Sequence, residues 1–345
     1  MKPVIAITLG DPAGIGPEIV AKTLADPETY RICNPVVVGD HHAVQMGIEV
    51  ARRNLGIHSI NSASEAVYKP GVIDLIDLNN VDPDKLVMGK AEAMSGAASA
   101  QYVIRAADMA LRNEVDAIVT APLNKEAMHM GGYNYPGHTE LLAEKSETKD
   151  YAMMLATGNL RVVHATTHIA FRDIPKLLTT ERIYTTIQIA QNACLSLGIE
   201  KPRIAVAGLN PHSGDGGLFG DEEARIIEPA IKQARDEGLN VDGPVPPDTV
   251  FGKAVGGQYD IVVAMYHDQG HIPVKLLGMK YDDSAGAWES VSGVNITLGL
   301  KFIRTSVDHG TAYGKAGRKE GTANPDSLKE ALQYAVRMAE ARKNQ

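Results

Sequence analysis

The sequence predicts an α/β protein with largely parallel sheets arranged in layered lobes. Short apolar runs rich in valine, isoleucine and alanine alternate with longer amphipathic segments along the 345 residues, as strands joined by crossover helices do. No repeat, low-complexity tract or obvious linker interrupts this alternation. The composition, with 44% hydrophobic and 22% charged residues, is that of a globular α/β chain. The length suggests about two domains or lobes.

The elements are placed by the length and period of their apolar runs. Strands are expected at Val4–Thr8, Pro35–Gly39, Val72–Leu78, Ala117–Thr120, Leu160–Thr167, Ile204–Leu209 and Ile261–Tyr266. Helices are expected at Pro17–Leu24, Ala91–Leu111, Arg182–Leu197, Asp221–Asp236 and Ser327–Arg342. Because the two ends of the chain carry elements of similar character, we expect a discontinuous first lobe, 1–130 plus 300–345, and a continuous second lobe, 131–299.

Three histidines, His168, His212 and His267, each follow one of the predicted strands. In α/β proteins, the carboxyl ends of the strands bring ligand-binding residues together from distant parts of the chain. Three neutral imidazoles are enough to bind a divalent cation that keeps open coordination positions, as a catalytic metal site does. The alternative is three unrelated histidines among the eleven of the chain, but their common position after a strand favours the metal site.

Charge and cysteine usage narrow the class of protein. The net charge is −8, and no basic stripe is present, which argues against a nucleic-acid-binding role. Cys33 and Cys194 form no CxxC pair, so we expect a reduced, cytoplasmic setting. The apolar segment at the N-terminus is too short for a signal peptide, and no apolar run approaches the roughly 18 residues that span a bilayer.

A glycine-rich turn follows the first predicted strand. It contains Gly14 and Gly16 and opens the first helix, where backbone amides favour an anion or a polar cofactor group. The segment matches neither GxGxxG nor GxxxxGK[ST], so a plain tight turn is an equal alternative.

Other polar residues are candidates for binding an anionic ligand. His138 lies in a loop that opens another helix, where it can donate to an anion and Thr139 can supply an N-terminal hydroxyl. An incidental histidine beside a helix cap is the alternative. Lys275 and Arg304 supply positive charge of the kind that holds a phosphate or carboxylate, unless they are solvated surface charges.

Taken together, ordered segments of the chain resemble the 4-hydroxythreonine-4-phosphate dehydrogenase family, from Ile5 to about Leu332. The segments are Gly10–Glu18, Pro136–Glu140, Asn210–His212, Met265–Gly270 and Val294–Gly299. The chain is most similar to the D-threonate/D-erythronate 4-phosphate dehydrogenase branch through Thr120–Glu126, Asn134–His138, Gly217–Glu223 and Gln269–Pro273. One departure is Lys280–Ser292, which is longer and more acidic than the family pattern and contains Trp288. It leaves the substrate identity open.

The resemblance implies the isocitrate/isopropylmalate-dehydrogenase-like fold, with two layered α/β/α lobes and a cleft between them. It implies metal ligands at His168, His212 and His267, shared between the subunits of a homodimer. It implies substrate contacts at His138, Thr139, Lys275, Asn295 and Arg304. In the wider superfamily, the nicotinamide cofactor is bound by the N-terminal glycine loop, with Gly14 and Gly16, and by positions that match His309, Gly310, Thr311 and Asn324.

The implied reaction is the oxidative decarboxylation of a phosphorylated four-carbon 3-hydroxy acid, D-threonate 4-phosphate or D-erythronate 4-phosphate, to dihydroxyacetone phosphate and carbon dioxide. NAD takes the hydride, and a divalent metal (zinc, magnesium, manganese or cobalt) polarises the hydroxyl oxygen. Asp248 and Asp268 are candidates for the general acid or base, or else orient a ligand histidine.

Other functions are open at this point. The first is 4-hydroxy-L-threonine 4-phosphate dehydrogenase of pyridoxal phosphate biosynthesis. The second is an acyl-phosphate transferase-like enzyme, and the third is a catalytically silent metabolite-binding protein on the same fold. The three histidines argue against a metal-free transferase.

Overall fold

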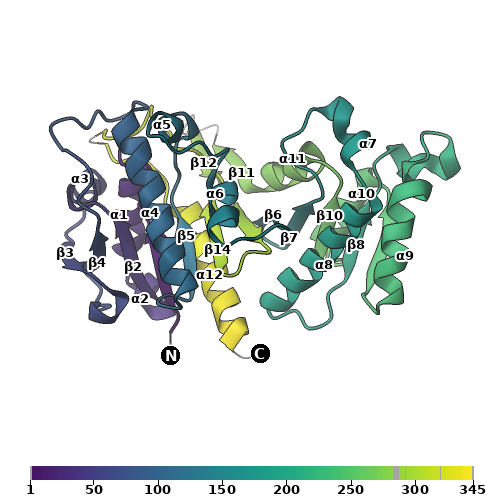
Figure 1. The fold of residues 1–345 in the computed structure, drawn as a ribbon, viewed down its shortest axis with the longest axis horizontal. Helices are drawn as coiled ribbons and strands as arrows, with labels where there is room; N and C mark the ends of the chain where they lie inside the picture. Colours follow the sequence, from purple (N-terminus) through teal and green to yellow (C-terminus); the bar gives the residue numbers. More distant parts are fainter. Residues whose placement is uncertain (1, 283–286, 292, 319, 344–345) are drawn as a thin grey trace. The chain divides into compact units, whose positions relative to one another are not determined.

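The computed structural model of the protein describes residues 2–282, 287–291, 293–318 and 320–343. Strands and helices alternate along the chain (Figure 1), so the predicted α/β class is confirmed. Among the described residues, no helix is both long enough and apolar enough to cross a membrane.

The chain divides into two compact units. The first unit comprises Met1–Lys149 and Leu300–Lys343, and the second comprises Asp150–Gly299. Residues 131–149, which we expected in the second lobe, belong to the first unit. The physical reason is that helix α6 (His138–Lys145) packs against helix α4 (Ala93–Leu111) of that unit.

The strands of the first unit form a parallel sheet. They are β1 (Val4–Thr8), β2 (Asn34–Gly39), β3 (Gly56–Ile60), β4 (Val72–Asp77), β5 (Ala117–Thr120) and β14 (Ile303–Val307). Their order across the sheet is β3-β4-β2-β1-β5-β14. β1 and β5 have the predicted bounds. β14 comes from late in the chain and pairs with β5, with Arg304 beside Ile118.

Helices connect these strands. They are α1 (Gly16–Leu24), α2 (Pro27–Ile32), α3 (His41–Ala51), α4, α5 (Lys125–Met130), α6 and α12 (Asp326–Lys343), with a 3₁₀ turn at Ala63–Glu65. Asp40 shows why α3 begins where it does. Its carboxylate accepts from the backbone amides of His42 and Ala43 at the start of the helix, and also from those of Asn80 and Val81.

The second unit contains a mixed sheet. Its strands are β6 (Ala152–Thr157), β7 (Leu160–His164), β8 (Ile204–Ala207), β9 (Val241–Val245), β10 (Ile261–Ala264) and β13 (Val294–Leu298). Their order is β13-β6-β7-β10-β8-β9. β6 pairs antiparallel with both of its neighbours, whereas β7, β10, β8 and β9 are parallel. The part that carries the predicted histidines is therefore parallel, as expected.

The stretch Lys280–Ser292 overlaps a separate antiparallel pair of strands, β11 (Met279–Asp282) and β12 (Ala287–Val291). Trp288 lies in β12, opposite Tyr281. Residues 283–286 and 292 lie outside the described residues.

The helices of the second unit are α7 (Ile174–Leu177), α8 (Thr180–Ser196), α9 (Glu228–Asp236), α10 (Pro247–Val255) and α11 (His267–Gly278). Phe171–Asp173 forms a 3₁₀ turn, and Pro211–Gly217 forms an irregular turn whose backbone is not helical at residues 212–216. The single helix predicted over Asp221–Asp236 is divided, because Glu223–Ile227 forms a π-helical turn before α9.

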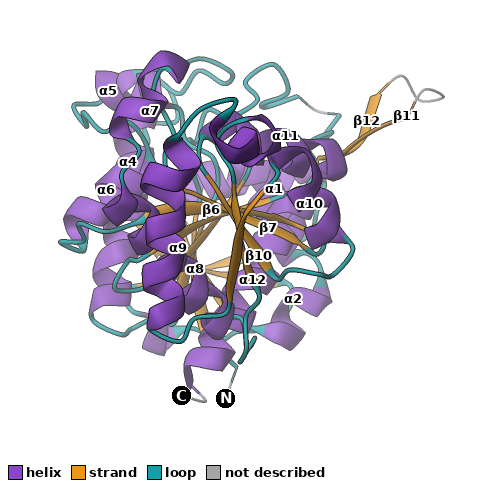
Figure 2. Cartoon of the chain, turned by 90° about the vertical axis from the view of Figure 1, so that its right-hand side faces the viewer, coloured by secondary structure: helices purple, strands orange, loops and turns teal. Residues whose placement is uncertain are grey.

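The core of the second unit is apolar and lies between its sheet and helices. It includes Leu155, Leu160, Val162, Ala205, Val250, Val262 and Val274. In Figure 2, α8 and α9 lie on one side of β10 and α10 lies on the other. Burial on both faces explains why these strands are continuous apolar runs in the sequence.

Gly96 provides a test of the packing in the first unit. A Cβ atom at Gly96 in α4 would lie 1.8 Å from the backbone oxygen of Ala127, whereas one at Gly252 in α10 would meet no described atom within 4 Å. We expect Gly96→Ala to lower the free energy of unfolding by about 1–3 kcal/mol through overpacking. Gly252→Ala should raise it by about 0.5–1 kcal/mol. Thermal denaturation measures both, and stabilisation by both variants would contradict the close contact.

Candidate functional site

Four histidines of the second unit lie together where β7 and β10 end. His164 is the last residue of β7, His168 follows in the next loop, and His267 and His271 lie one turn apart on α11. The ring centroids of His168 and His267 are 5.6 Å apart, and the rings of His267 and His271 are stacked at 3.5 Å. His164 and His271 were not among the predicted site residues. The signal for His271 was its spacing of four from His267.

The parallel pairing of β7 with β10 explains why His168 and His267 meet. After the strands end, Ala165 still donates its amide to Ala264, at 2.8 Å. The hydroxyl of Thr166 donates to the carbonyl of Met265, at 2.7 Å. The guanidinium of Arg182, from α8, donates to the carbonyl of Ala165. The segments that precede His168 and His267 are thus hydrogen-bonded to each other, and the first is also bonded to helix α8.

Asp268 is placed to orient the ring of His267. Its carboxylate lies 2.7 Å from Nδ1 of His267. A carboxylate in that position holds the proton on Nδ1, which leaves Nε2 with its lone pair for a metal. Of the two candidate carboxylates, Asp268 therefore contacts a predicted ligand and suits the orienting role, while Asp248 is exposed in the first turn of α10.

The geometry of one chain fits two of the three predicted metal ligands. A tetrahedral ion bound through imidazole nitrogens at about 2.1 Å holds the ring centroids about 5 Å apart. The separation of 5.6 Å between His168 and His267 agrees with that value. His212 is not brought into this pair. Among the described residues of the single chain, no group of three or more His, Cys, Asp or Glu residues is arranged to hold a metal.

His212 lies in an exposed turn with an unusual backbone. Residues 212–216 all have φ between 44° and 80°, in the left-handed region. The buried carboxylate of Glu223 holds the start of this turn, because it accepts from the backbone amides of Leu209 and Asn210 at 2.8 and 2.7 Å. Glycine is favoured at position 214, because its φ is +80° and a Cβ there would lie 2.9 Å from the carboxylate of Glu223. Glu223 is a supporting residue that sequence reasoning did not identify.

His164 is a neutral, buried histidine at the edge of the cluster. Its Nε2 has no hydrogen-bond partner among the described residues. Burial and the neighbouring His271 lower the pKa of His164 to about 3. Gly270 packs directly on the ring, because a Cβ there would lie 2.4 Å from Nε2.

In the first unit, Arg304 is a buried cation. It lies on β14, is 2% exposed, and donates from Nη2 to the hydroxyl of Thr120 at the end of β5, at 2.7 Å. Burial lowers the pKa of Arg304 to about 9, opposed by the negative charge of Glu140, so the guanidinium is still protonated at neutral pH. The alternative that Arg304 is a solvated surface charge is therefore wrong.

His138 lies near the guanidinium of Arg304. It is the first residue of α6, whose N-cap is Gly137, so Thr139 lies at the second position of the helix and not at the cap. Nε2 of His138 is buried and has no hydrogen-bond partner among the described residues. Burial, followed by the positive charges of Arg304 and Lys125, holds the pKa of His138 well below its ordinary value. A neutral imidazole with an unused nitrogen beside two cations is suited to binding an anion.

Lys275 and Asn295 belong to the second unit. Lys275 lies on α11, two turns after His267, and Asn295 lies on β13. The amide nitrogen of Asn295 contacts the sulfur of Met153 at 3.1 Å, while its carbonyl oxygen is buried without a hydrogen-bond partner among the described residues. Such an oxygen can accept a bond from a ligand.

The predicted glycine loop packs onto one of the predicted cofactor segments. The amide of Ile15 donates to the carbonyl of Thr311 at 3.0 Å, and the hydroxyl of Tyr313 donates to the carboxylate of Asp11 at 2.7 Å. A Cβ at Gly14 would lie 3.0 Å from Thr311, and one at Gly16 would lie 2.2 Å from a backbone oxygen. Internal packing thus accounts for both glycines, which by themselves do not indicate a ligand.

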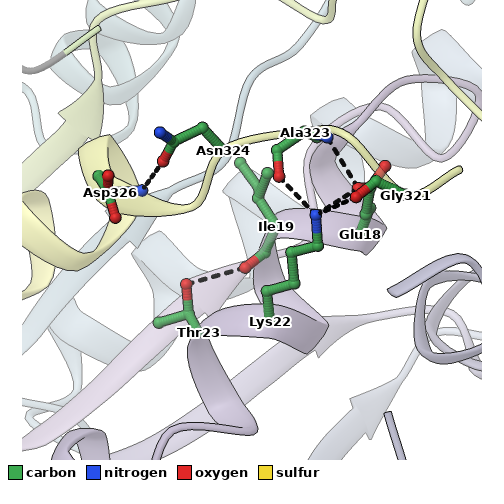
Figure 3. A network of polar contacts seen from close by, with 8 residues as sticks. All are labelled: Glu18, Ile19, Lys22, Thr23, Gly321, Ala323, Asn324 and Asp326. Carbon is green, nitrogen blue, oxygen red and sulfur yellow. Dashed lines mark hydrogen bonds and ion pairs between the residues drawn. The ribbon is translucent and has the colours of Figure 1, made fainter. Parts of the chain in front are cut away.

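Of the other predicted cofactor residues, Gly310 and Asn324 are exposed and His309 is half-buried. His309 and Gly310 follow the carboxyl end of β14, and Asn324 precedes α12. Asn324 is exposed, and its carbonyl oxygen accepts from the amide of Asp326 at 2.7 Å (Figure 3). This bond orients the side chain and leaves its NH₂ group as a donor for a polar ligand.

Comparisons with known proteins find matches over most of the chain. Residues 31–335 match the family model of the pyridoxal phosphate biosynthetic protein PdxA. The chain is 49% identical to D-threonate 4-phosphate dehydrogenase of Salmonella typhimurium, over 97% of this chain and 98% of that protein. It is 47% identical to 4-hydroxythreonine-4-phosphate dehydrogenase of Trichlorobacter lovleyi, over 99% of each. The crystal structure of 4-hydroxythreonine-4-phosphate dehydrogenase from Klebsiella pneumoniae matches with a TM-score of 0.87 at 46% identity, over 98% of each chain.

The lowered pKa of His138 predicts a pH effect on stability. When the pH is below about 6.5, the ordinary pKa of histidine, this residue binds a proton in the unfolded chain but not in the folded chain. Stability contributed by the neutral His138 is therefore lost as the pH falls, by up to about 1.4 kcal/mol per pH unit. We expect His138→Gln to lose less stability than the wild type between about pH 8 and about pH 5 in thermal denaturation. Identical pH profiles would show that His138 titrates normally.

Proposed function

Because the chain belongs to the family of the pyridoxal phosphate biosynthetic protein PdxA, we propose that it is a NAD- and metal-dependent dehydrogenase of a phosphorylated four-carbon 3-hydroxy acid. The substrate that we favour is D-threonate 4-phosphate or D-erythronate 4-phosphate. It would be oxidised and decarboxylated to dihydroxyacetone phosphate and carbon dioxide. The similarity to relatives named as dehydrogenases extends over nearly the whole chain, so the oxidoreductase class follows from the family.

The observation that carries the substrate class is the cationic group around Arg304. A buried guanidinium needs a negative partner to offset its lost hydration. Glu140 supplies one negative charge, but Lys125 adds a second positive charge near His138. The positive charges of Arg304 and Lys125 therefore outnumber the negative charge of Glu140, and a bound anion would offset the difference. Arg304 can bind an anion through paired hydrogen bonds and His138 through its unused ring nitrogen. A phosphate or carboxylate of the substrate matches that requirement.

We assign the metal to His168 and His267 of one chain and His212 of a second copy. The contact between the first two rings supports their sharing one ion. Large apolar side chains exposed on the same elements support an interface there. Phe171 is 74% exposed, and Ile272 and Leu276, one turn apart on α11, are 65% and 78% exposed. Exposed apolar groups of this size favour burial against another chain.

In this function, residues of the chain bind, orient and hold protons. Arg304 and His138 hold an anionic end of the substrate, so that binding energy from an unreactive group positions the reacting carbon. Asp268 keeps the proton of His267 on Nδ1. When bound, the metal would supply Lewis-acid polarisation of the substrate hydroxyl, and NAD would supply the hydride acceptor.

A second candidate is 4-hydroxy-L-threonine 4-phosphate dehydrogenase, favoured by the 47% identity to a relative of that name. The two candidates differ in the group on the carbon next to the carboxylate, an amine or a hydroxyl. Both substrates carry a phosphate and a carboxylate, so the cationic group around Arg304 suits either.

The function is tested by NADH formation with added divalent metal. We expect D-threonate 4-phosphate or D-erythronate 4-phosphate to give the highest kcat/KM, with 4-hydroxy-L-threonine 4-phosphate lower. Arg304→Met should lower kcat/KM for the phosphorylated acid about 10- to 150-fold, the effect of losing a charged hydrogen-bond partner worth about 1.5–3 kcal/mol. Binding of NAD should be unchanged.

Lys301→Met is the matched control, because Lys301 pairs with Glu147 near the surface, with its side chain 56% exposed. We expect it to retain wild-type kcat/KM. No NADH with any of the three substrates would overturn the proposed reaction and favour a silent binding protein or a transferase. Wild-type kcat/KM in Arg304→Met would overturn the assignment of Arg304 to anion binding.

The shared metal site predicts complementation between inactive variants. In a mixed dimer of His212→Ala and His267→Ala subunits, one site would combine intact His168 and His267 with the intact His212 of the other subunit. We therefore expect activity to recover in part when the two proteins are mixed under conditions that exchange subunits.

The control is a mixture of His168→Ala with His267→Ala. Because we assign these two ligands to the same chain, each site of that mixed dimer would lack one of them, and activity should not return. Recovery in the control but not in the test mixture would assign the ligands differently. No recovery in either mixture, despite subunit exchange, would argue against a shared site.

A further inference from the structure

An ion pair on α1 holds the segment that precedes α12 in the first unit (Figure 3). The ammonium of Lys22 donates to Glu18 at 2.7 Å, to the carbonyl of Gly321 at 2.7 Å and to the carbonyl of Ala323 at 2.6 Å. These bonds use all three donors of the lysine. The side chains of Lys22 and Glu18 are only 13% and 3% exposed, so the pair is shielded from water.

Glu18 holds the same segment through a backbone amide, whereas Lys22 holds it through backbone carbonyls. Its Oε1 accepts from the backbone amide of Ala323 at 2.9 Å, so both backbone polar groups of Ala323 are bound by one pair of side chains. Burying two charges costs hydration free energy, and apolar side chains would join a helix to a loop at lower cost. What the pair provides in addition is a fixed position, because its hydrogen bonds are directional.

The residue held in this way is next to Asn324. The carbonyl oxygen of Asn324 is used by the amide of Asp326, so the orientation of its NH₂ group follows from the position of residues 321–323. The turn before α1 also holds the other predicted cofactor segment, through Ile15 and Thr311. One helix and the turn that opens it therefore contact both the segment of Asn324 and that of Thr311, and the amide of Asp308 also joins the second segment to α12 by donating to the hydroxyl of Ser327.

We propose that Glu18 and Lys22 are positioning residues for the nicotinamide cofactor. They hold Asn324 at the distance from the 309–311 segment that the cofactor requires, so that the loop is ordered before the cofactor binds. Order in the free protein removes the entropic cost of fixing the loop on binding. The inference rests on the proposed function, which supplies the cofactor and its contacts.

The test is NAD binding by isothermal titration calorimetry, followed by steady-state kinetics. We expect Lys22→Met to weaken NAD binding about tenfold or more, because the loop must then be ordered on binding. The KM for the phosphorylated acid, and kcat at saturating NAD, should stay near the wild-type values. Glu18→Gln keeps an oxygen for the amide of Ala323 but removes the charge, so its loss of NAD affinity should be smaller than that of Lys22→Met.

Lys343→Met is the control, because Lys343 pairs with Asp116 at 2.8 Å at the other end of α12. It should retain wild-type NAD affinity. NAD affinity within twofold of wild type in Lys22→Met would overturn the inference while leaving the proposed function intact. Equal losses of NAD and substrate affinity would also overturn it, since they indicate a general structural role.

Two further outcomes are covered by the Glu18→Gln variant and by the wild-type protein. If Lys22→Met does not fold, Glu18→Gln decides, and an unchanged dissociation constant for NAD in that variant rejects the positioning role. If the wild type does not bind NAD, the cofactor assignment itself fails, and this inference fails with it.

Discussion

The parallel pairing of β14 with β5 is the contact on which the first unit depends. The chain re-enters the first unit at Leu300, and β14 then adds to the sheet beside β5. The pairing places Arg304 beside Ile118, where it is buried. The guanidinium reaches Thr120 at the end of β5. The carboxyl end of β14 then leads to the 309–311 segment, and α12 packs back on β14 and β5. This one strand pairing therefore positions both Arg304 and the predicted cofactor segment that follows β14.

A second theme is the use of buried and half-buried polar side chains to hold the loops that carry the proposed site residues. Glu223 holds the turn of His212 through two backbone amides. Arg182 holds the end of β7 ahead of His168, and Glu18 with Lys22 holds the segment of Asn324. In each case a charged group that is wholly or partly removed from water is bonded to backbone atoms. Such bonds are directional, so they fix position where apolar packing alone would permit sliding.

The regular elements were predictable where an apolar run was long and its ends were marked. β1 and β5 have the expected bounds, and α12 differs from its prediction by one residue at each end. β3, β6, β9, β13 and β14 were among the strands not predicted; β3 carries partly exposed polar residues and β9 contains Gly243 and Pro244. The helix predicted over Asp221–Asp236 is interrupted by a π-helical turn that contains Glu223, a change that periodicity cannot reveal.

The sequence by itself determined the α/β class, the family and the identity of the candidate residues, because these depend on local patterns and on residue types in order. Only the tertiary structure decided which candidates meet. It brings His168 against His267 and places His271 and His164 beside them, but leaves His212 outside that group. It also decided that Arg304 is buried and that Gly14 and Gly16 serve internal packing. Contacts of this kind join residues far apart in the chain, so they depend on strand pairing and helix packing that no local pattern encodes.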